Sequence, residues 1–489
     1  MNASRMIPLD VSKEIRALLP IWITCVAVVW AGGIDDQSGF LFRAGFLVSI
    51  LGSATLGGLS IGHEYTNRTL SLMLTVPASR RRIFAIKAGV LLSMLLILAL
   101  VAFSRLPAAP AGRLMEDTVV VGIVSVLGSA FLAPWLTIVC RNPLAGAVFS
   151  ISIPPMFLLG SELLTLALFG VAGMKSPLAE HFKAEVLWGG ILLVSAFGAF
   201  SSWRAFMNLE AVEGPQGDLW LPRWSGDAEP AASARVVYRP AHPVWQLVKK
   251  ELHLQQLTFL VSGLYLCGWI AIVVIQRLGG REIDQPLVIL TVVHGAIIAL
   301  LSGSLASGEE RHFGTLESQV LMPISMARQW AVKAGTVFGL CVALALLLPL
   351  VLGLSVPSPQ PMRIGSGFAL VVICLASVSL YVSSVCNSGL QALLLSLPVA
   401  MCFVVLFQAV RFSVAWVAHM SGLLPALSRD ALEPGWESSL LGAILVMVLL
   451  RFALINHRSS DRAPARLWRQ ILWMTASMAF GISVALFVV

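Results

Sequence analysis

Three side chains in one apolar segment, His294, Ser302 and Ser304, are of the types that form a catalytic nucleophile and its base. A serine becomes nucleophilic when a base such as histidine lies within hydrogen-bonding distance. On one helix, however, spacings of 8 and 10 residues separate these serines from His294 by at least two turns, or about 12 Å. No third orienting group is evident. We therefore expect His294 to hydrogen-bond a neighbouring helix, and we predict no catalytic residues and no enzyme activity.

Motifs for nucleotide or metal chemistry are absent from the sequence. The dipeptide Gly-Lys never occurs, so there is no Gly-x-x-x-x-Gly-Lys-Ser/Thr loop that could bind phosphates. The 7 cysteines lie inside or at the ends of apolar segments, with no C-x-x-C and no metal-ligand spacing. We expect them to behave as small buried apolar residues. We predict no directly bound cofactor and no metal.

The segments that must position these residues are long and apolar. The chain of 489 residues is 57% hydrophobic and only 12% charged, whereas a soluble protein carries about 25% charged residues. A helix needs about 20 apolar residues to cross a bilayer, and a membrane β-strand would alternate apolar and polar residues. The charge-free blocks do not alternate: 18–33, 46–61, 119–140, 287–307 and 367–386. The sequence therefore predicts an all-α polytopic membrane protein.

The two halves of the chain resemble each other at an offset of 246 residues. Between residues 62–89 and 308–335 there are 11 identities without a gap, where unrelated sequence of ordinary composition would give roughly two. At a slightly shorter offset, Val11, Lys13 and Glu14 match Val248, Lys250 and Glu251. We therefore predict a tandem repeat of two six-helix transmembrane units.

Each half can be divided into six predicted spans. They lie near 17–33, 40–62, 87–104, 117–140, 144–170 and 185–205, and near 256–276, 286–307, 333–356, 365–386, 388–412 and 438–455. Because six is even, both halves have the same orientation, as in a parallel repeat. The predicted domains are 1–205 and 243–456, with a cytoplasmic linker at 206–242 and a basic C-terminal segment at 457–489. That last segment includes a possible extra helix at 471–489.

The best-matched segment is the connection between the second and third spans of each half. A threonine can cap a short helix there. Apolar residues at helical spacing form an apolar face on this helix, and a proline ends it. A single copy would be interpreted equally well as an ordinary interfacial helix with basic flanks, but two copies favour a functional elbow. The residues that define the two elbows are Glu64, Arg68, Thr69, Leu70, Pro77, Ser79 and Arg82, and Glu310, Arg311, Gly314, Thr315, Leu316, Glu317, Pro323, Ser325 and Arg328.

The second elbow reads acid–Arg–x–x–Gly–Thr–Leu–Glu, then Pro–x–Ser, then Arg and Lys, and this pattern resembles the ABC-2 type permease family. In that family the elbow is the coupling helix that docks on the ATPase subunit. The resemblance implies an exporting permease, with ATP and Mg held by separate ATPase subunits on the cytoplasmic face. The segments Val11–Arg16 and Val248–His253 look like the family's connecting helices. The first elbow departs from the pattern, since Tyr65, Arg68 and Ser71 replace its Arg, Gly and Glu.

The net charge of +8 has a topological explanation. Cytoplasmic loops of membrane proteins collect Lys and Arg, and with the N-terminus inside most basic residues fall on that side. The opposite side balances its basic residues with acids. There is no Lys/Arg-and-aromatic platform for nucleic acid. We predict a multi-pass protein of the inner (cytoplasmic) membrane with a cytoplasmic N-terminus and no nucleic-acid partner.

One acidic residue, Glu162, lies within the predicted fifth span. Ionisable residues at such positions often mark a pathway, and Gln408 lies at the corresponding position of the second half, 246 residues later. The two side chains could polarise a shared pathway between the halves. The alternative is that Glu162 lies close to the outer interface and is hydrated.

A secondary active transporter with no ATPase partner is the alternative function. Such a protein would also have parallel repeats, with broken helices near mid-membrane, and Pro154–Pro155 and Pro398 could break two spans. This alternative does not explain why the best-matched segment lies outside the spans. Close helix contacts are also predicted, at Gly58-x-x-x-Gly62 and Ser304-x-x-x-Gly308, because small residues at this spacing let helices approach in lipid.

Overall fold

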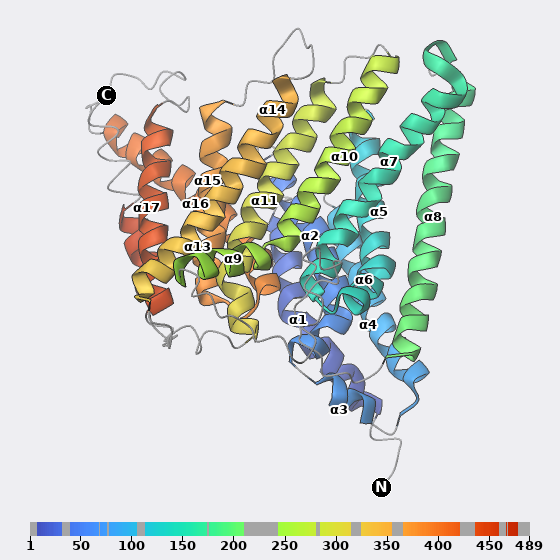
Figure 1. Ribbon diagram of the computed structural model, residues 1–489, viewed down its shortest axis with the longest axis horizontal. Coiled ribbons are helices and arrows are strands. Elements are labelled where there is room, and N and C mark those ends of the chain that lie inside the picture. The colour runs from blue at the N-terminus through green and yellow to red at the C-terminus, as the bar shows by residue number, and fades with distance from the viewer. Residues whose placement is uncertain are drawn as a thin grey trace, which may run out of the picture. The chain divides into compact units, whose positions relative to one another are not determined.

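The computed structural model shows a chain of helices joined by connections of varied length (Figure 1). It describes residues 7–31, 40–67, 69–75, 78–104, 113–173, 176–209, 243–279, 284–313, 324–354, 365–420, 436–458, 466 and 468–477. Among these residues there is no β-strand. The chain divides into two compact units, Met1–His242 with Cys267–Glu282 and Pro243–Leu266 with Ile283–Val489. We call them the first and the second unit.

The first unit contains six long helical segments and one short helix. Its elements are α1 (Ile7–Ala31), α2 (Phe40–Thr66), the short α3 (Leu70–Thr75), α4 (Arg80–Ser104), α5 (Arg113–Leu127), the π-helix η2 (Gly128–Leu132), α6 (Ala133–Cys140), α7 (Pro143–Gly173) and α8 (Pro177–Met207). The elements α5, η2 and α6 follow one another without a gap and form the fourth long segment. The fifth and sixth, α7 and α8, lie side by side (Figure 1).

The second unit opens with a separate short helix. Its elements are α9 (Pro243–Leu254), α10 (Gln256–Gly279), α11 (Asp284–Phe313), α13 (Met326–Leu340), the π-helix η3 (Cys341–Leu347), α14 (Leu348–Leu354), α15 (Ser366–Val385), α16 (Gly389–Met420) and α17 (Trp436–Arg458). The residues of α10 from Cys267 onward belong to the first unit. Here the wide π-turns lie in the third long segment, whereas in the first unit they lie in the fourth. No sequence signal predicted either position.

The distribution of side chains is that of a membrane protein. Within the described residues, 9 helices are long and apolar enough to cross a membrane. Their outer surfaces expose large apolar side chains, such as Leu193 at 69% and Leu96 at 61%, while serines such as Ser53 and Ser129 are buried between helices. Apolar exposure on this scale is unfavourable in water. The predicted all-α polytopic membrane fold is confirmed.

Several helices are longer than the spans that the apolar blocks predicted. The third segment was expected to begin at residue 87, but α4 begins at Arg80, and its counterpart α13 begins at Met326 rather than at 333. The backbone N–H groups of Arg82 and Ile83 both donate to the carbonyl oxygen of Ser79, which starts the helix seven residues earlier. Hydropathy marks where a helix enters lipid, whereas basic residues extend it into the interface.

The opening segments of the two units differ. Residues 11–16 were expected to form a short amphipathic segment of their own, but they continue into the first span as one helix, α1. In the second unit the corresponding helix α9 ends at Leu254, and Gln255 separates it from α10. The side chain of Gln255 fixes this break, because its Nε2 donates to the carbonyl oxygen of Ser302 at 2.9 Å and its Oε1 accepts from Thr258 at 2.8 Å.

Small residues bring helices close together in both units, as predicted. A Cβ atom added to Gly62 would lie 2.3 Å from the Cβ of Pro143, the first residue of α7. A Cβ added to Gly308 would lie 2.7 Å from the Cα of Gly389, the first residue of α16. Pro143 and Gly389 are themselves 246 residues apart. In each unit the second long helix therefore contacts the start of the fifth.

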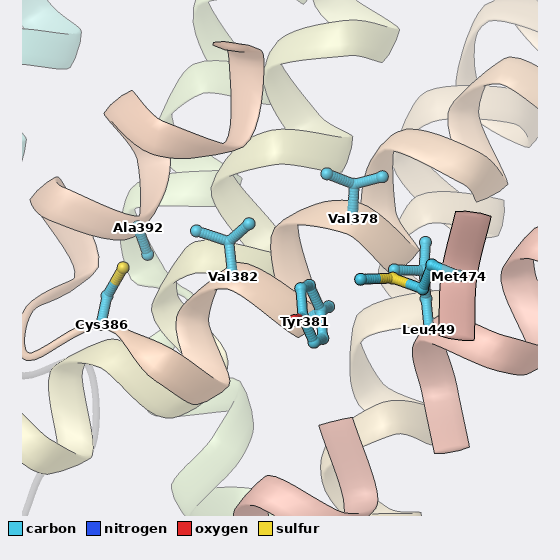
Figure 2. Close-up of a cluster of buried hydrophobic side chains, with 7 residues drawn as sticks. All are labelled: Val378, Tyr381, Val382, Cys386, Ala392, Leu449 and Met474. Carbon is cyan, nitrogen blue, oxygen red and sulfur yellow. The ribbon is translucent and has the colours of Figure 1, made fainter. Parts of the chain in front are cut away.

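A helical segment at 468–477 packs against the second unit. Met474 joins a buried apolar cluster with Tyr381 of α15 and Leu449 of α17 (Figure 2). Beside it, Gln470 Nε2 donates to Asn456 Oδ1 at 2.8 Å, and Tyr381 Oη donates to Gln470 Oε1 at 3.1 Å. The described part of the predicted extra C-terminal helix therefore packs against α15 and α17 and is hydrogen-bonded to both.

Candidate functional site

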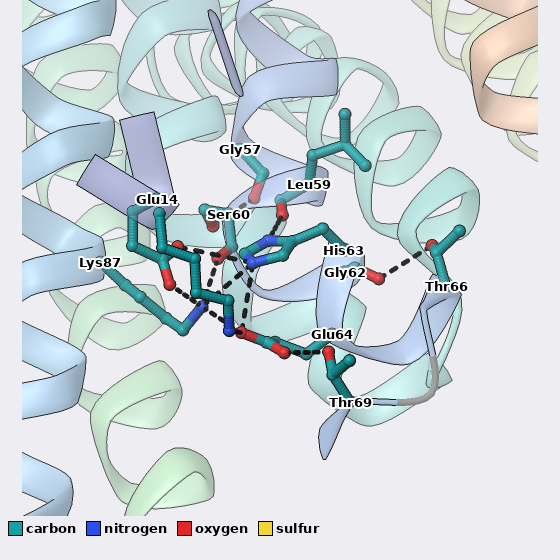
Figure 3. Close-up of polar contacts among 11 residues, drawn as sticks. Glu14, Gly57, Leu59, Ser60, Gly62, His63, Glu64, Thr66, Thr69 and Lys87 are labelled. Atoms are coloured by element: carbon teal, nitrogen blue, oxygen red, sulfur yellow. Dashed lines mark hydrogen bonds and ion pairs between the residues drawn. The ribbon is translucent and has the colours of Figure 1, made fainter. Parts of the chain in front are cut away.

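A buried ion cluster joins three helices of the first unit where the first elbow begins (Figure 3). The ammonium group of Lys87, on α4, lies 2.7 Å from a carboxylate oxygen of Glu14 on α1 and 3.2 Å from one of Glu64 on α2. Lys13, on α1, lies 3.0 Å from the same oxygen of Glu64. Lys87 and Glu64 are 3% and 0% exposed, so these charges are removed from solvent.

The second unit contains a cluster of the same composition. The ammonium group of Lys333, on α13, lies 3.2 Å from Glu251 on α9 and 2.5 Å from Glu310 on α11. Lys250, on α9, lies 2.8 Å from the other oxygen of Glu310. Lys333, Glu251 and Glu310 are all buried.

The two clusters use corresponding residues. Glu64 and Glu310, like Lys87 and Lys333, are 246 residues apart, and Lys13–Glu14 and Lys250–Glu251 are 237 apart. Even the backbone contacts correspond, because Lys87 approaches the carbonyl oxygen of Ser60 and Lys333 donates to that of Ala306. In each unit, one lysine therefore ties the opening helix and the second span to the third.

Each cluster depends on the pairing of its charges. A buried ion is costly unless an opposite charge and hydrogen bonds compensate it, and removing one partner typically costs about 3–5 kcal/mol. The first cluster pairs two lysines with two glutamates. The imidazole of His63 adds a contact, with its Nε2 3.2 Å from Glu64 and 3.6 Å from Glu14.

The second unit has an additional buried acid next to Glu310 in the sequence. Glu309 stands where the first unit has His63, is 5% exposed, and forms no hydrogen bond or ion pair with the described residues. Glu251 lies on α9, outside the spans, and burial raises its pKa to about 7, against the opposing effect of Lys333. The position before Glu310 therefore carries a carboxyl group where the first unit carries an imidazole.

Three groups in the first cluster could also be considered as metal ligands. One ligand atom each from Glu14, His63 and Glu64 lies within 4.8 Å of the others. The Lys87 ammonium, however, already contacts both carboxylates, at 2.7 and 3.2 Å. A bound cation would have to displace this ammonium, so we interpret the cluster as an ion-paired joint and not as a metal centre.

The first elbow leaves this cluster directly and forms α3. Thr69 does not cap α3 through its side chain as expected; its hydroxyl donates to the Glu64 carboxylate, which links the elbow to the cluster. Met73 is buried against Ile61, Tyr65 and Phe206. Leu70 packs at the edge of the same apolar cluster.

The outer face of this elbow is also apolar and basic. Leu72 is 66% exposed on α3, and Arg82 is exposed where α4 begins, as is Ser79 just before that helix. Apolar exposure outside the spans of a membrane protein marks a surface that can be covered by another protein. Arg68 and Pro77, two further residues of the predicted elbow, lie outside the described residues.

The second elbow is described only at its two ends. Glu310 belongs to the ion cluster, and Arg311 Nη1 donates to the carbonyl oxygen of Cys386 at 3.4 Å. Ser325 is the residue before α13, but its side chain makes no capping hydrogen bond; Arg328 is exposed. The remaining predicted residues lie outside the described part of the chain: Gly314, Thr315, Leu316, Glu317 and Pro323.

The intramembrane residues singled out from the sequence have separate partners. His294 Nε2 lies 3.1 Å from the carbonyl oxygen of Leu344 in η3, which confirms the expected bond to a neighbouring helix. Ser302 and Ser304 contact carbonyl oxygens of their own helix, and Ser302 Oγ also lies 3.3 Å from Cys341 Sγ in η3. Glu162, on α7, forms an ion pair with Lys183 on α8, with its side chain 24% exposed. Gln408 lies on α16, and its side chain lies outside the described residues.

Sequence reasoning identified part of the site and missed its centre. Glu64 and Glu310 were assigned to the elbows, whereas Lys87 and Lys333 were not among the candidate residues, although both lie in the matched ranges 62–89 and 308–335. The available signal was that isolated charges, next to long apolar blocks, recur at the same offset in both halves.

In comparisons with known proteins, no family model matches the chain, and no curated protein or solved structure matches it either. The features of the molecule that bear on its function are the two clusters, the elbows and the membrane fold.

Proposed function

We propose that the chain is the membrane-spanning permease of an ABC-2 type transporter, built as a tandem repeat of two six-helix units. In this proposal, ATP and Mg are bound by two separate ATPase subunits that dock at the elbows, and the transporter exports its substrate. The observation that carries the proposal is the pair of corresponding ion clusters. Each one fixes the helix that leads into an elbow, as expected of a segment that must transmit force.

The clusters suggest how movement at an elbow would reach the spans. In the first unit, Lys87 and Glu64 connect the two helices on either side of the elbow, and Glu14 adds the opening helix. A displacement of α3 would therefore move three spans together instead of being absorbed by a loose connection. ATP-driven closure of the ATPase subunits would shift the population between two states of the permease.

The orientation proposed from the basic residues agrees with this arrangement. Arg80, Arg81 and Arg82 lie at the elbow end of α4 and are exposed, as expected of a cytoplasmic boundary. We propose the inner (cytoplasmic) membrane as the location, with the N-terminus and both elbows in the cytoplasm.

Co-purification of an ATPase tests this function. The full chain is purified from its native membranes in mild detergent, and the sample is assayed for ATP hydrolysis and for labelling of a separate polypeptide by azido-ATP. We expect both signals in the wild type and their loss in Leu72→Glu, which places a charge on the exposed face of α3. Leu178→Glu is the matched control, because Leu178 is 68% exposed but begins α8 at the opposite end of the first unit.

The outcomes separate the two candidate functions. Loss of the ATPase in Leu72→Glu alone supports the permease. If the wild type carries no ATP-binding polypeptide in several mild detergents, the secondary active transporter takes its place. The Glu162–Lys183 ion pair, within the apolar first unit, is then the first pair to examine for coupling to an ion gradient.

A further inference from the structure

A cavity of about 90 Å³ lies within the first unit, beside the ion cluster. It is bounded by α2, α4, the η2–α6 segment and α8. Most of its lining is apolar, including Ile61, Phe84, Leu91, Phe131, Pro134 and Ala199. Such a lining fits a hydrocarbon chain better than a hydrated ion.

One polar group in the lining has no partner among the described residues. Ser202, on α8, is 2% exposed, and its Oγ makes no hydrogen bond there. Ser60 lines the same cavity, but its Oγ donates to the carbonyl oxygen of Gly57 at 2.7 Å. A buried hydroxyl without a partner costs about 1–3 kcal/mol. The Ser202 hydroxyl therefore lacks an acceptor that an occupant of the cavity could provide.

Basic residues gather at the end of the unit near this cavity. Ser202 lies five residues before the end of α8 at Met207, which corresponds to about 8 Å along the helix. There, the guanidinium group of Arg80 donates to the carbonyl oxygen of Met207 at 2.5 Å and bridges α4 and α8. Arg81 and Arg204 are exposed at the same end of these two helices. The cavity thus lies at the depth where lipid carbonyls meet phosphates.

The surroundings of the cavity indicate that an occupant would come from the bilayer. Leu92 lines the cavity and is 44% exposed, and Leu96, one turn further along α4, is 61% exposed. On α8, Phe200 is 56% exposed beside Ala199. These outward side chains face lipid in a membrane, so lipid is the molecule nearest to the cavity.

We propose that this cavity binds one anionic phospholipid as a resident ligand of the first unit. An acyl chain occupies the apolar cavity, an ester carbonyl accepts a hydrogen bond from Ser202, and the phosphate lies near Arg81 and Arg204. Basic sites between transmembrane helices bind anionic headgroups in this way. The second unit lacks the basic pair at the start of its third segment, where Met326 and Ala327 correspond to Arg80 and Arg81. The site does not depend on an ATPase partner.

Native mass spectrometry of the full chain tests the site. The purified protein is incubated with phosphatidylglycerol or with phosphatidylcholine of the same acyl chains, and bound lipid is counted. We expect one retained phosphatidylglycerol and weaker retention of phosphatidylcholine. Ala199→Leu fills the cavity and should abolish retention, whereas Ala196→Leu, the same change at an exposed position one turn away on α8, should not.

Two further variants test the polar contacts without adding bulk. Ser202→Ala removes one hydrogen bond and should weaken retention about fivefold. The double variant Arg81→Gln with Arg204→Gln should remove the preference for phosphatidylglycerol, while Arg277→Gln, on α10, should leave it unchanged. Equal retention of the two lipids by the wild type overturns the proposal. So does unchanged retention in both Ala199→Leu and Ser202→Ala, which would mean that the cavity holds only water.

Discussion

The two ion clusters share their lysines and glutamates but differ at one position. His63 in the first unit contacts both glutamates, whereas Glu309 in the second unit adds a buried acid that has no partner among the described residues. The shared pairs hold the helices that flank each elbow. The lysine–glutamate pairs are therefore the common requirement of the two clusters, and the residue at position 63 or 309 can differ.

The largest expected effect comes from removing the central lysine of either cluster. Lys333→Met leaves Glu251 and Glu310 with only Lys250, and we expect a loss of about 3–5 kcal/mol in the free energy of unfolding. Lys87→Met should cost less, because Lys13 still contacts Glu64 and the imidazole of His63 still contacts both glutamates. Unfolding of the purified protein, followed by intrinsic fluorescence in detergent, measures both losses. An equal and negligible loss in the two variants would show that the clusters are not structural joints.

An effect of pH is expected from the second cluster. Burial raises the pKa of Glu251 to about 7, from an ordinary value of 4.5. Between these values the folded state binds more protons than the unfolded state, so stability should increase as the pH falls from about 7 towards 4.5. The slope contributed by one group is at most about 1.4 kcal/mol per pH unit. Stability curves of wild type and Glu251→Gln at several pH values test this, and the variant should lose the contribution.

The smallest changes in the free energy of unfolding are expected from substitutions of His63 and Glu309, which occupy corresponding positions in the two units. One substitution should lower the free energy of unfolding and the other should raise it. His63→Gln removes a contact to two glutamates and should destabilise the protein by about 1 kcal/mol. Glu309→Gln removes a buried charge without a partner and should stabilise it by about the same amount. The same unfolding measurement applies. If Glu309→Gln lowers the free energy of unfolding, the carboxyl group of Glu309 does not destabilise the second unit.

Much of the fold follows from the sequence, for an identifiable reason. Charge-free blocks such as 119–140 must cross the membrane, so they locate the spans. They do not locate helix ends, because Arg80 and its neighbours extend α4 beyond the apolar block. The π-helices η2 and η3 left no signal in residue type or spacing.

The site was predictable only in part. The elbows stand out because Glu64 and Pro77 recur with the same spacing as Glu310 and Pro323. The ion cluster requires that α1, α2 and α4 meet at Lys87, which no local pattern reveals. Ser202 and its cavity were missed for the same reason, since packing of separate helices creates both.

Site-specific photocrosslinking can show whether an ATPase docks at the first elbow. The photoreactive residue p-benzoylphenylalanine is placed at Leu72 on the exposed face of α3 and, in a second variant, at Leu178 at the other end of the first unit. Native membranes are then irradiated, and crosslinked partners are probed with azido-ATP. We expect an ATP-binding polypeptide to be crosslinked from position 72 and none from position 178. No ATP-binding partner at position 72, or equal crosslinking from both positions, would contradict this expectation.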